Sequence, residues 1–540
     1  MRMTRFAALA TGLLLSTTAS AQTVTAPAGT VQGTTEGALS VFRGIPYAQP
    51  PVGARRWTAP APLPAWEGVR KATAFGPACV QPRATATGIY ANPPAAVSED
   101  CLTLNIWAPK AAKGAPVVVW IHGGALVSGY SHEPMYDGTR MAGEGVIVVS
   151  INYRLGILGY LAHNALSAQS PQGVSGNYGL LDQVAALSWV KRNIGAFGGD
   201  PANVTIAGES AGALSVMYLM ASPSARGLFH KAIAQSAYMV STPELKTARH
   251  GMPSAEAAGT TIAAALGAPT LAALRAMDAE KLTATAAAKG YGPWGTVDGR
   301  ILPRQLVETW DRGEQAPVPL IAGFNAGEIR SLRMLAPPVP ASAAVYEQTI
   351  RARYGDLADA FLAQYPAATL GESVIATTRD ALYGWTSTRL AIGQTALRQP
   401  GYLYFFDHGY PAADDAGLHA FHAAEIPYVF GTPDKTPAYW PRVPDTLSDR
   451  RMSTAMLGYW TSFAKTGAPS AKGAPAWQAY GNAGNYMAFA ATPQARQKLL
   501  PGMFALHEAS VCRRRAAGDA PWNWNTGLLS PVLKPATGCR

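Results

Sequence analysis

One serine stands between two glycines, after a β-branched run and before an alanine-rich stretch. Residues 204–214 read VTIAGESAGAL, with Ser210 at the centre of a Gly-x-Ser-x-Gly pattern. The first half favours a strand and the second half a helix, so Ser210 is predicted to lie on a sharp strand-to-helix turn. Gly208 and Gly212 lack the side chains that would clash there. Because a strand and a helix flank it, the pattern predicts an exposed, nucleophilic serine rather than a plain Ser-Gly turn.

A nucleophilic serine also requires N–H donors for the oxyanion that its attack creates. The residue after the nucleophile supplies one, which is the backbone N–H of Ala211. The segment WIHGGALVSGY, residues 120–130, is predicted to end a strand at His122, and Gly123 and Gly124 follow. Small residues let backbone N–H groups approach a bound oxygen, and one such donor contributes about 3 kcal/mol to transition-state stabilisation. A plain glycine turn is the alternative, which the neighbouring serine pattern disfavours.

The acid and the base are expected later in the chain, in the order serine, acid, histidine. Glu328 is the first acid after the strand predicted at residues 318–325. Three histidines follow the next strand and compete for the role of base: His408, His419 and His422. The base must reach the serine hydroxyl with one nitrogen while its other N–H donates to the acid. His419, His422 and Glu425 could instead suggest a metal site, but no further ligand is apparent, and we predict none.

The elements that must position these residues are read from hydrophobic runs. Near-continuous apolar runs without alternation indicate strands buried on both faces of a mostly parallel sheet. They cover residues 116–122, 146–153, 203–209, 318–325 and 402–408. Helical patterns lie between them, at residues 180–197 and 452–467. This alternation predicts an α/β fold, and we expect one large domain over residues 22–540, with surface loops at residues 84–96 and 336–344.

The N-terminus reads as a secretory signal peptide. Arg2 and Arg5 precede a short apolar stretch, and Ala19-Ser20-Ala21 forms a small-residue cleavage site. We therefore expect residues 1–21 to be removed and the protein to be periplasmic or secreted, in a bacterial host. A membrane anchor is the alternative, but the stretch is shorter than the roughly 20 residues of a spanning helix. No later segment is long and apolar enough, so no stable membrane insertion is expected.

The cysteines and the net charge bear on disulfide bonding and on the kind of partner that the protein binds. Export favours disulfides among the four cysteines, and proximity in sequence favours Cys79–Cys101 and Cys512–Cys539 among three possible pairings. The formal charge is +11, and cleavage removes two of the arginines, which leaves +9. A polyanionic partner is one interpretation of this charge. The basic residues are scattered and form no nucleic-acid motif, so we expect no nucleic-acid partner.

Several blocks together resemble the type-B carboxylesterase family of α/β hydrolases, which includes cholinesterases and bacterial p-nitrobenzyl esterases. The resemblance covers nearly the whole mature chain. The blocks are FRGIPYAQPPVG (42–53), SEDCLTLNIWAP (98–109), NYRLGILGYL (152–161), NYGLLDQVAALSWVKRNI (177–194) and GGDPANVTIAGESAGA (198–213). The implied fold is a large, mostly parallel sheet flanked by helices, with insertions at residues 249–295 and 338–376 that would form a gorge.

The resemblance also implies a role for individual residues. Its catalytic serine, acid and histidine fall on Ser210, Glu328 and His422, the last because His422 lies three residues before a glutamate. Its oxyanion donors fall on Gly123, Gly124 and Ala211. It implies the Cys79–Cys101 disulfide and the ion pairs Arg56–Glu99 and Arg154–Asp182, whereas a Cys512–Cys539 pair is less typical. The implied activity is hydrolysis of small-molecule carboxylic esters through an acyl-enzyme, with no cofactor.

Two departures from the family pattern bear on activity and substrate. The oxyanion loop reads Gly-Gly-Ala rather than Gly-Gly-Gly, which is a known variant and leaves activity expected. The loop between Cys79 and Cys101 has no tryptophan, and Tyr90 is its sole aromatic residue. In cholinesterases a tryptophan there stacks on the choline cation. We therefore expect uncharged or anionic acyl esters of short to medium chain length, or aryl esters.

Other functions on the same fold are alternatives. An amidase or an acyltransferase would use the same residues, and sequence does not separate them from an esterase. Non-catalytic adhesion relatives typically lack a triad member, whereas all three are present here. The oligomeric state stays open.

Overall fold

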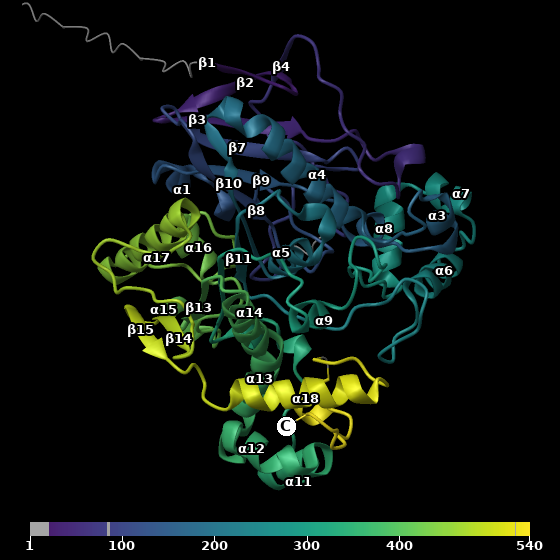
Figure 1. The fold of residues 1–540 in the computed structure, drawn as a ribbon, viewed down its shortest axis with the longest axis vertical. Coiled ribbons are helices and arrows are strands. Elements are labelled where there is room, and N and C mark those ends of the chain that lie inside the picture. The colour runs from purple at the N-terminus through teal and green to yellow at the C-terminus, as the bar shows by residue number, and fades with distance from the viewer. Residues whose placement is uncertain (1–20, 84–86, 524, 540) are drawn as a thin grey trace, which may run out of the picture.

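One large twisted sheet organises the protein, which we describe from a computed structural model covering residues 21–83, 87–523 and 525–539. The predicted signal peptide, apart from Ala21, lies outside the described residues. Thirteen strands form the sheet, in the order β1-β2-β3-β7-β9-β8-β10-β11-β12-β13-β14-β15, with β4 beside β2. Figure 1 shows the N-terminal strands at one end of the molecule and β14 and β15 toward the other. The pairs from β9 through β8, β10, β11, β12, β13 to β14 are parallel.

The strands have these bounds: β1 Ala21–Ala26, β2 Gly29–Glu36, β3 Leu39–Pro46, β4 Val69–Lys71, β5 Ala78–Cys79, β6 Val97–Ser98, β7 Thr103–Pro109, β8 Ala115–Ile121, β9 Ile147–Ile151, β10 Gly199–Glu209, β11 Lys231–Gln235, β12 Leu320–Asn325, β13 Gly401–Phe406, β14 Asn485–Phe489 and β15 Pro493–Gln497. All five predicted strands are present, as β8, β9, β10, β12 and β13. The other strands were not predicted, and β11 is the one nearest the centre of the sheet; its run KAIAQ is short and carries polar residues at both ends.

Both faces of the central sheet are buried, as the unbroken apolar runs predict. In β8, Val117, Val119 and Ile121 belong to one core cluster, and Val118 and Trp120 belong to the other. The first cluster includes residues of α4 (Tyr178–Asn193) and α5 (Ala211–Ala221). The second includes residues of α16 (Ile426–Phe430) and α17 (Leu447–Thr466). Helices therefore cover the two faces, which is the predicted α/β-hydrolase architecture.

The other helices are α1 Thr139–Gly143, α2 Gly156–Tyr160, α3 Asn164–Gln169, α6 Ala255–Ala265, α7 Leu271–Ala276, α8 Ala279–Ala288, α9 Leu306–Asp311, α10 Glu328–Ser331, α11 Ala343–Tyr354, α12 Ala358–Gln364, α13 Leu370–Arg379, α14 Trp385–Ala396, α15 Pro411–Asp415 and α18 Met503–Ala517. Helix α17 begins five residues before its predicted start, because its first turn is polar and the Thr446 side chain caps it by accepting the Asp449 N–H. It ends at Thr466, and the glycine that follows, Gly467, has a φ of +81°.

The predicted cross-links are present. Cys79 is bonded to Cys101, and Cys512, in α18, is bonded to Cys539. The ion pairs Arg56–Glu99 and Arg154–Asp182 both form, with shortest N–O distances of 2.6 and 2.8 Å.

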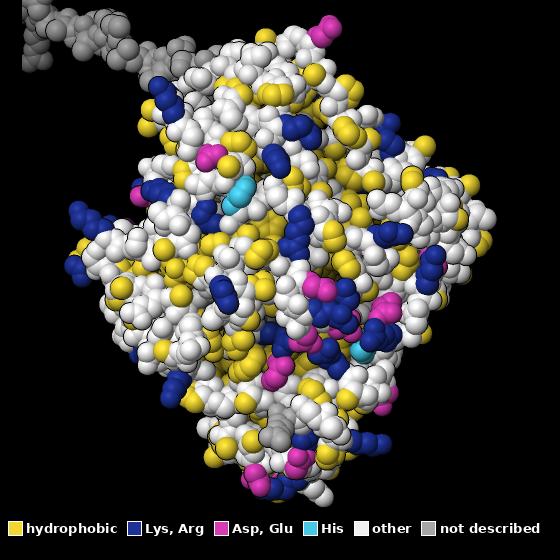
Figure 2. Space-filling model, in the orientation of Figure 1, with side chains coloured by type: hydrophobic (Ala, Val, Ile, Leu, Met, Phe, Trp, Pro, Cys, Tyr) yellow, Lys and Arg dark blue, Asp and Glu magenta, His cyan; other side chains and the backbone are white. Residues whose placement is uncertain are grey.

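Two surface properties bear on partners. In the face that Figure 2 shows, lysine and arginine side chains are dispersed, and several lie beside acidic ones. Among the described residues, no helix is both long enough and apolar enough to cross a membrane.

Candidate active site

The serine turn is strained in the way that a nucleophile elbow requires. Strand β10 ends at Glu209 and helix α5 begins at Ala211, which leaves Ser210 alone between them. Its φ is +55° and its ψ is −120°, a conformation that side-chain-bearing residues rarely adopt. The Ser210 N–H donates to the Gln235 carbonyl oxygen at 2.9 Å, so the neighbouring strand β11 helps to hold the turn.

The flanking glycines are required by close packing. A methyl group added at Gly212 would lie 2.0 Å from the Ile121 carbonyl oxygen at the end of β8. One added at Gly208 would lie 2.5 Å from the Gly212 carbonyl carbon. Neither space admits a Cβ atom, so the elbow is pressed against the end of β8, where the glycine-rich loop begins.

That loop lies directly beside the serine. A Cβ at Gly123 would lie 3.3 Å from Ser210 Cβ and 2.9 Å from the Glu209 carbonyl oxygen. Gly124, at φ +100°, turns the chain, and its carbonyl oxygen accepts the N–H groups of Val127 and Ser128 at 2.9 Å each. Ala211 is the first residue of α5, where helix N–H groups have no intrahelical partner. The three predicted donors therefore belong to two backbone segments that meet at Ser210.

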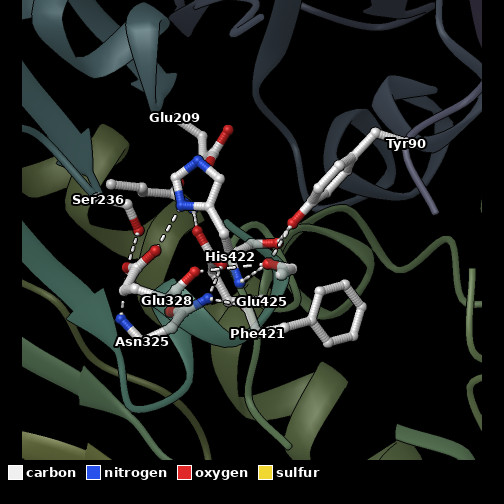
Figure 3. A network of polar contacts seen from close by, with 10 residues as sticks. Tyr90, Glu209, Ser236, Asn325, Glu328, Phe421, His422 and Glu425 are labelled. Carbon is white, nitrogen blue, oxygen red and sulfur yellow. Dashed lines mark hydrogen bonds and ion pairs between the residues drawn. The ribbon is translucent and has the colours of Figure 1, made fainter. Parts of the chain in front are cut away.

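The predicted acid and histidine are joined. Glu328 begins α10 just after β12 and is fully buried. Its Oε1 accepts the Asn325 N–H at 2.8 Å and the Ser236 hydroxyl at 2.6 Å. Its Oε2 accepts a hydrogen bond from His422 Nδ1. Figure 3 shows the His422 imidazole between the carboxyl groups of Glu328 and Glu209.

The second nitrogen of His422 faces Glu209. Nε2 lies 3.1 Å from Glu209 Oε1, and within the described part of the chain no hydrogen bond joins Ser210 Oγ to His422. The expected contact of the base with the serine is therefore absent from this arrangement. The imidazole instead lies beside the buried carboxyl group of Glu209, the residue that directly precedes Ser210. Catalytic hydrogen bonds are often long in ligand-free enzymes and tighten with substrate.

Burial and neighbouring charges set the protonation of this pair. Burial alone would lower the pKa of His422, but the negative charges of Glu209 and Glu328 outweigh it and raise that pKa to about 9. Burial raises the pKa of Glu209 to about 8, although the His422 charge opposes the shift. Burial also raises the pKa of Glu425. The site thus favours a protonated imidazole surrounded by buried carboxyl groups.

The other two candidate histidines lie elsewhere. His408 Nε2 contacts Asp449 Oδ1 at 2.9 Å, away from the serine turn. His419 binds Asp407 and Asp414, and its side chain is 38% exposed. His419, His422 and Glu425 contact separate sets of residues, and the described part of the chain contains no group of three or more such side chains arranged for a metal ion.

Several residues that complete the site were not predicted. Glu425 anchors the histidine loop, because its carboxyl group accepts Asn325 Nδ2 at 2.6 Å and Gln235 Nε2 at 2.9 Å. Glu209 stands inside the quoted pentapeptide and Glu425 inside the histidine block, so both were visible in the sequence. Ser236 carries no sequence signal, since only the fold brings β11 beside the acid loop.

The comparisons with known proteins agree with this architecture. The family described as "Carboxylesterase family" matches residues 20–505. Fumonisin B1 esterase of Sphingopyxis macrogoltabida is 37% identical over 85% of this chain and 85% of its own. Para-nitrobenzyl esterase of Bacillus subtilis is 37% identical over 85% of this chain and 92% of its own.

Solved structures give the same result. A PNB esterase structure superposes with a TM-score of 0.76 at 35% identity, covering 88% of this chain and 97% of its own. A carboxylesterase of Geobacillus stearothermophilus gives a TM-score of 0.73 at 34% identity, covering 90% and 99%. The match of family, relatives and fold over most of the chain leaves one conclusion: this protein belongs to the carboxylesterase family and is a carboxylic ester hydrolase.

Proposed function

We propose that the protein hydrolyses carboxylic esters in two steps through an acyl-enzyme on Ser210, with His422 as base and Glu328 as its partner. The observation that carries this proposal is the convergence of three segments. Ser210 stands on a strained turn against Gly123. His422 Nδ1 is hydrogen-bonded to Glu328, while its Nε2 faces Glu209, the residue before the serine.

The proposed chemistry follows from these positions. His422 Nε2 turns from Glu209 to Ser210 Oγ and takes its proton as the oxygen attacks the ester carbonyl carbon. Backbone N–H groups of Gly123, Gly124 and Ala211 stabilise the oxyanion. His422 then protonates the leaving alcohol, and in the second step it activates the water that releases the acid. Glu328 holds the imidazole tautomer and stabilises its positive charge.

We propose neutral esters, with an aryl or a short to medium acyl group, as the substrate class. The absence of a tryptophan between Cys79 and Cys101 supports this class, because the loop then lacks the indole face on which a choline cation would stack. The relatives with printed substrates include a para-nitrobenzyl esterase and a phenmedipham hydrolase.

We also propose that the mature protein is exported after cleavage behind Ala21. Two disulfides suit an oxidising compartment. Ala21 is the first residue of β1, so this cleavage leaves the rest of the edge strand in place. N-terminal sequencing of protein from the bacterial periplasm or medium should begin at Gln22, and an intact N-terminus would contradict export by this signal.

A panel of p-nitrophenyl esters and matched anilides tests the proposed reaction. We expect hydrolysis of the esters and at least about 100-fold slower cleavage of the amides. Butyrylthiocholine and a neutral isostere of equal size form the substrate comparison. A strong preference for the choline ester would contradict the proposed substrate class, and equal cleavage of anilides would indicate an amidase.

A further inference from the structure

The loop closed by the Cys79–Cys101 disulfide contacts the backbone of His422 through one side chain. The Tyr90 hydroxyl oxygen lies 2.8 Å from the His422 carbonyl oxygen and 2.8 Å from Ser331 Oγ. Figure 3 shows the phenol reaching from one side toward the backbone of the histidine segment. Ser331 Oγ in turn accepts the His422 N–H at 3.3 Å. Both polar backbone groups of His422 are therefore contacted by these two hydroxyl groups.

The two hydroxyl hydrogens are sufficient for the contacts between Tyr90, Ser331 and the His422 carbonyl oxygen. A phenol has one hydrogen, so Tyr90 donates to one acceptor at a time, and the Ser331 hydroxyl can supply the other hydrogen. Tyr90 is 40% exposed, and a phenol keeps its hydrogen at neutral pH because its ordinary pKa is about 10. The ring also meets Trp440 edge-on at 5.8 Å between centroids, and Trp440 packs on Phe421 at 4.7 Å. Tyr90 thus contacts the histidine segment through its hydroxyl group and, by way of Trp440, through aromatic packing.

The acid loop is part of the same arrangement. Ser331 is the last residue of α10, the short helix that begins with Glu328. The segment after Glu328 and the backbone of His422 are therefore tied to a single hydroxyl group from a third part of the chain. Near its other end, the disulfide loop pairs with the glycine-rich loop, because Gln81 exchanges two hydrogen bonds of 3.0 Å with the backbone of Gly129.

We propose that Tyr90 is a positioning residue for the reaction. It holds the backbone of His422 so that the imidazole stays hydrogen-bonded to Glu328. This role rests on the proposed function of His422. Tyr90 does not touch the imidazole itself, and its effect passes through the histidine main chain and Ser331. The disulfide loop, which in cholinesterases carries a cation-binding tryptophan, would here support the base through its sole aromatic residue.

Removing the phenolic oxygen tests the proposal with little change in shape. For Tyr90→Phe we expect kcat on p-nitrophenyl acetate to fall by about tenfold, the scale of one lost hydrogen bond, with KM within twofold. Ser331→Ala should give a similar loss, and the double variant should lose less than the product of the two. Tyr439→Phe is the matched control, since Tyr439 is 55% exposed and neighbours Trp440. It should leave kcat unchanged.

A second measurement does not depend on esterase activity. The His422 N–H should exchange with deuterium several-fold faster in Tyr90→Phe than in the wild type, with an unchanged Tm. A kcat within twofold of wild type, or unchanged exchange at His422, would overturn the proposal. A wild-type protein that hydrolyses no ester would instead contradict the proposed function, while the exchange result would still decide whether Tyr90 holds His422.

Discussion

The two sides of the site are built in different ways. Ser210 belongs to five consecutive residues of one strand-turn-helix unit, and its strand β10 lies between the parallel strands β8 and β11. His422 belongs to the segment from residue 407 to 425, in which α15 is the sole helix. The serine is therefore positioned by local backbone geometry and the histidine by contacts with distant residues.

The contacts of the histidine segment come from several elements. Asn325 Nδ2 donates to the Phe421 carbonyl oxygen at 2.8 Å as well as to Glu425. The Gly327 N–H donates to the Ala420 carbonyl oxygen at 2.7 Å. Asn325 and Gly327 lie about a hundred residues before the segment that they hold. The difference teaches that a nucleophile elbow can be recognised from a pentapeptide, whereas the base is defined only when the fold is assembled.

Loss of the serine should have the largest effect. Ser210→Ala is expected to lower kcat by at least about 10⁴-fold, because it removes the proposed nucleophilic oxygen. The variant should keep the wild-type Tm, since the substitution removes one oxygen. Steady-state hydrolysis of p-nitrophenyl acetate and a thermal melt check both points. Retention of most of the turnover would show that Ser210 is not the nucleophile.

Loss of the base should have the next largest effect. We expect His422→Ala to lower kcat by about 10³-fold or more, the scale of removing a triad member. His419→Ala is the matched variant three residues away, and it should change kcat by less than about tenfold, because its imidazole binds Asp407 and Asp414 instead. The reverse result would mean that the histidine segment is assigned incorrectly.

Local packing of the elbow can be tested by stability. Gly212→Ala should lower the free energy of unfolding by about 1–3 kcal/mol, because its Cβ would overlap the Ile121 carbonyl oxygen. Gly371→Ala, in helix α13, is the control, since a Cβ there meets no atom within 4 Å. Urea unfolding of both variants provides the comparison. Equal stability of the two would argue against a tightly packed elbow.

The electrostatic link between the two sides should give the smallest effect. The neutral imidazole is the base, so kcat/KM rises with pH as His422 loses its proton. Since Glu209 and Glu328 raise that pKa to about 9, the rise should occur above the usual histidine range near pH 6.5. Glu209→Gln removes one negative charge and should move the rise to lower pH. A pH profile that stays in place would show that Glu209 does not control the base.

Much of this site could be predicted because its signals are local. The serine turn, the glycine pair and the strand ends all follow from short patterns of residue size and hydrophobicity. Glu328 was predicted as the acid because it is the first carboxylate after a strand, and in the structure it is hydrogen-bonded to His422. Unbroken apolar runs also indicated a sheet buried on both faces, which the two core clusters confirm.

The rest depends on contacts between distant residues. The residues alone left three histidines as candidates for the base, and the family resemblance selected His422 among them. Nothing in the sequence indicates that Ser236 hydrogen-bonds Glu328, or that His422 Nε2 faces Glu209 rather than the serine. Three buried carboxyl groups around the His422 imidazole raise its pKa to about 9, and no local pattern in the sequence indicates this. Such crowding of charges appears only when β10, β12 and the histidine segment are brought together.

Covalent labelling tests the central claim most directly, that Ser210 is the nucleophile and His422 activates it. The protein would be treated with a fluorophosphonate, and intact mass and peptide mapping would locate the adduct in the wild type and in His422→Ala. We predict one adduct per chain, on Ser210, formed at least about 10³-fold more slowly without the His422 imidazole. An adduct on another residue, or labelling of Ser210 at an unchanged rate in His422→Ala, would contradict the account.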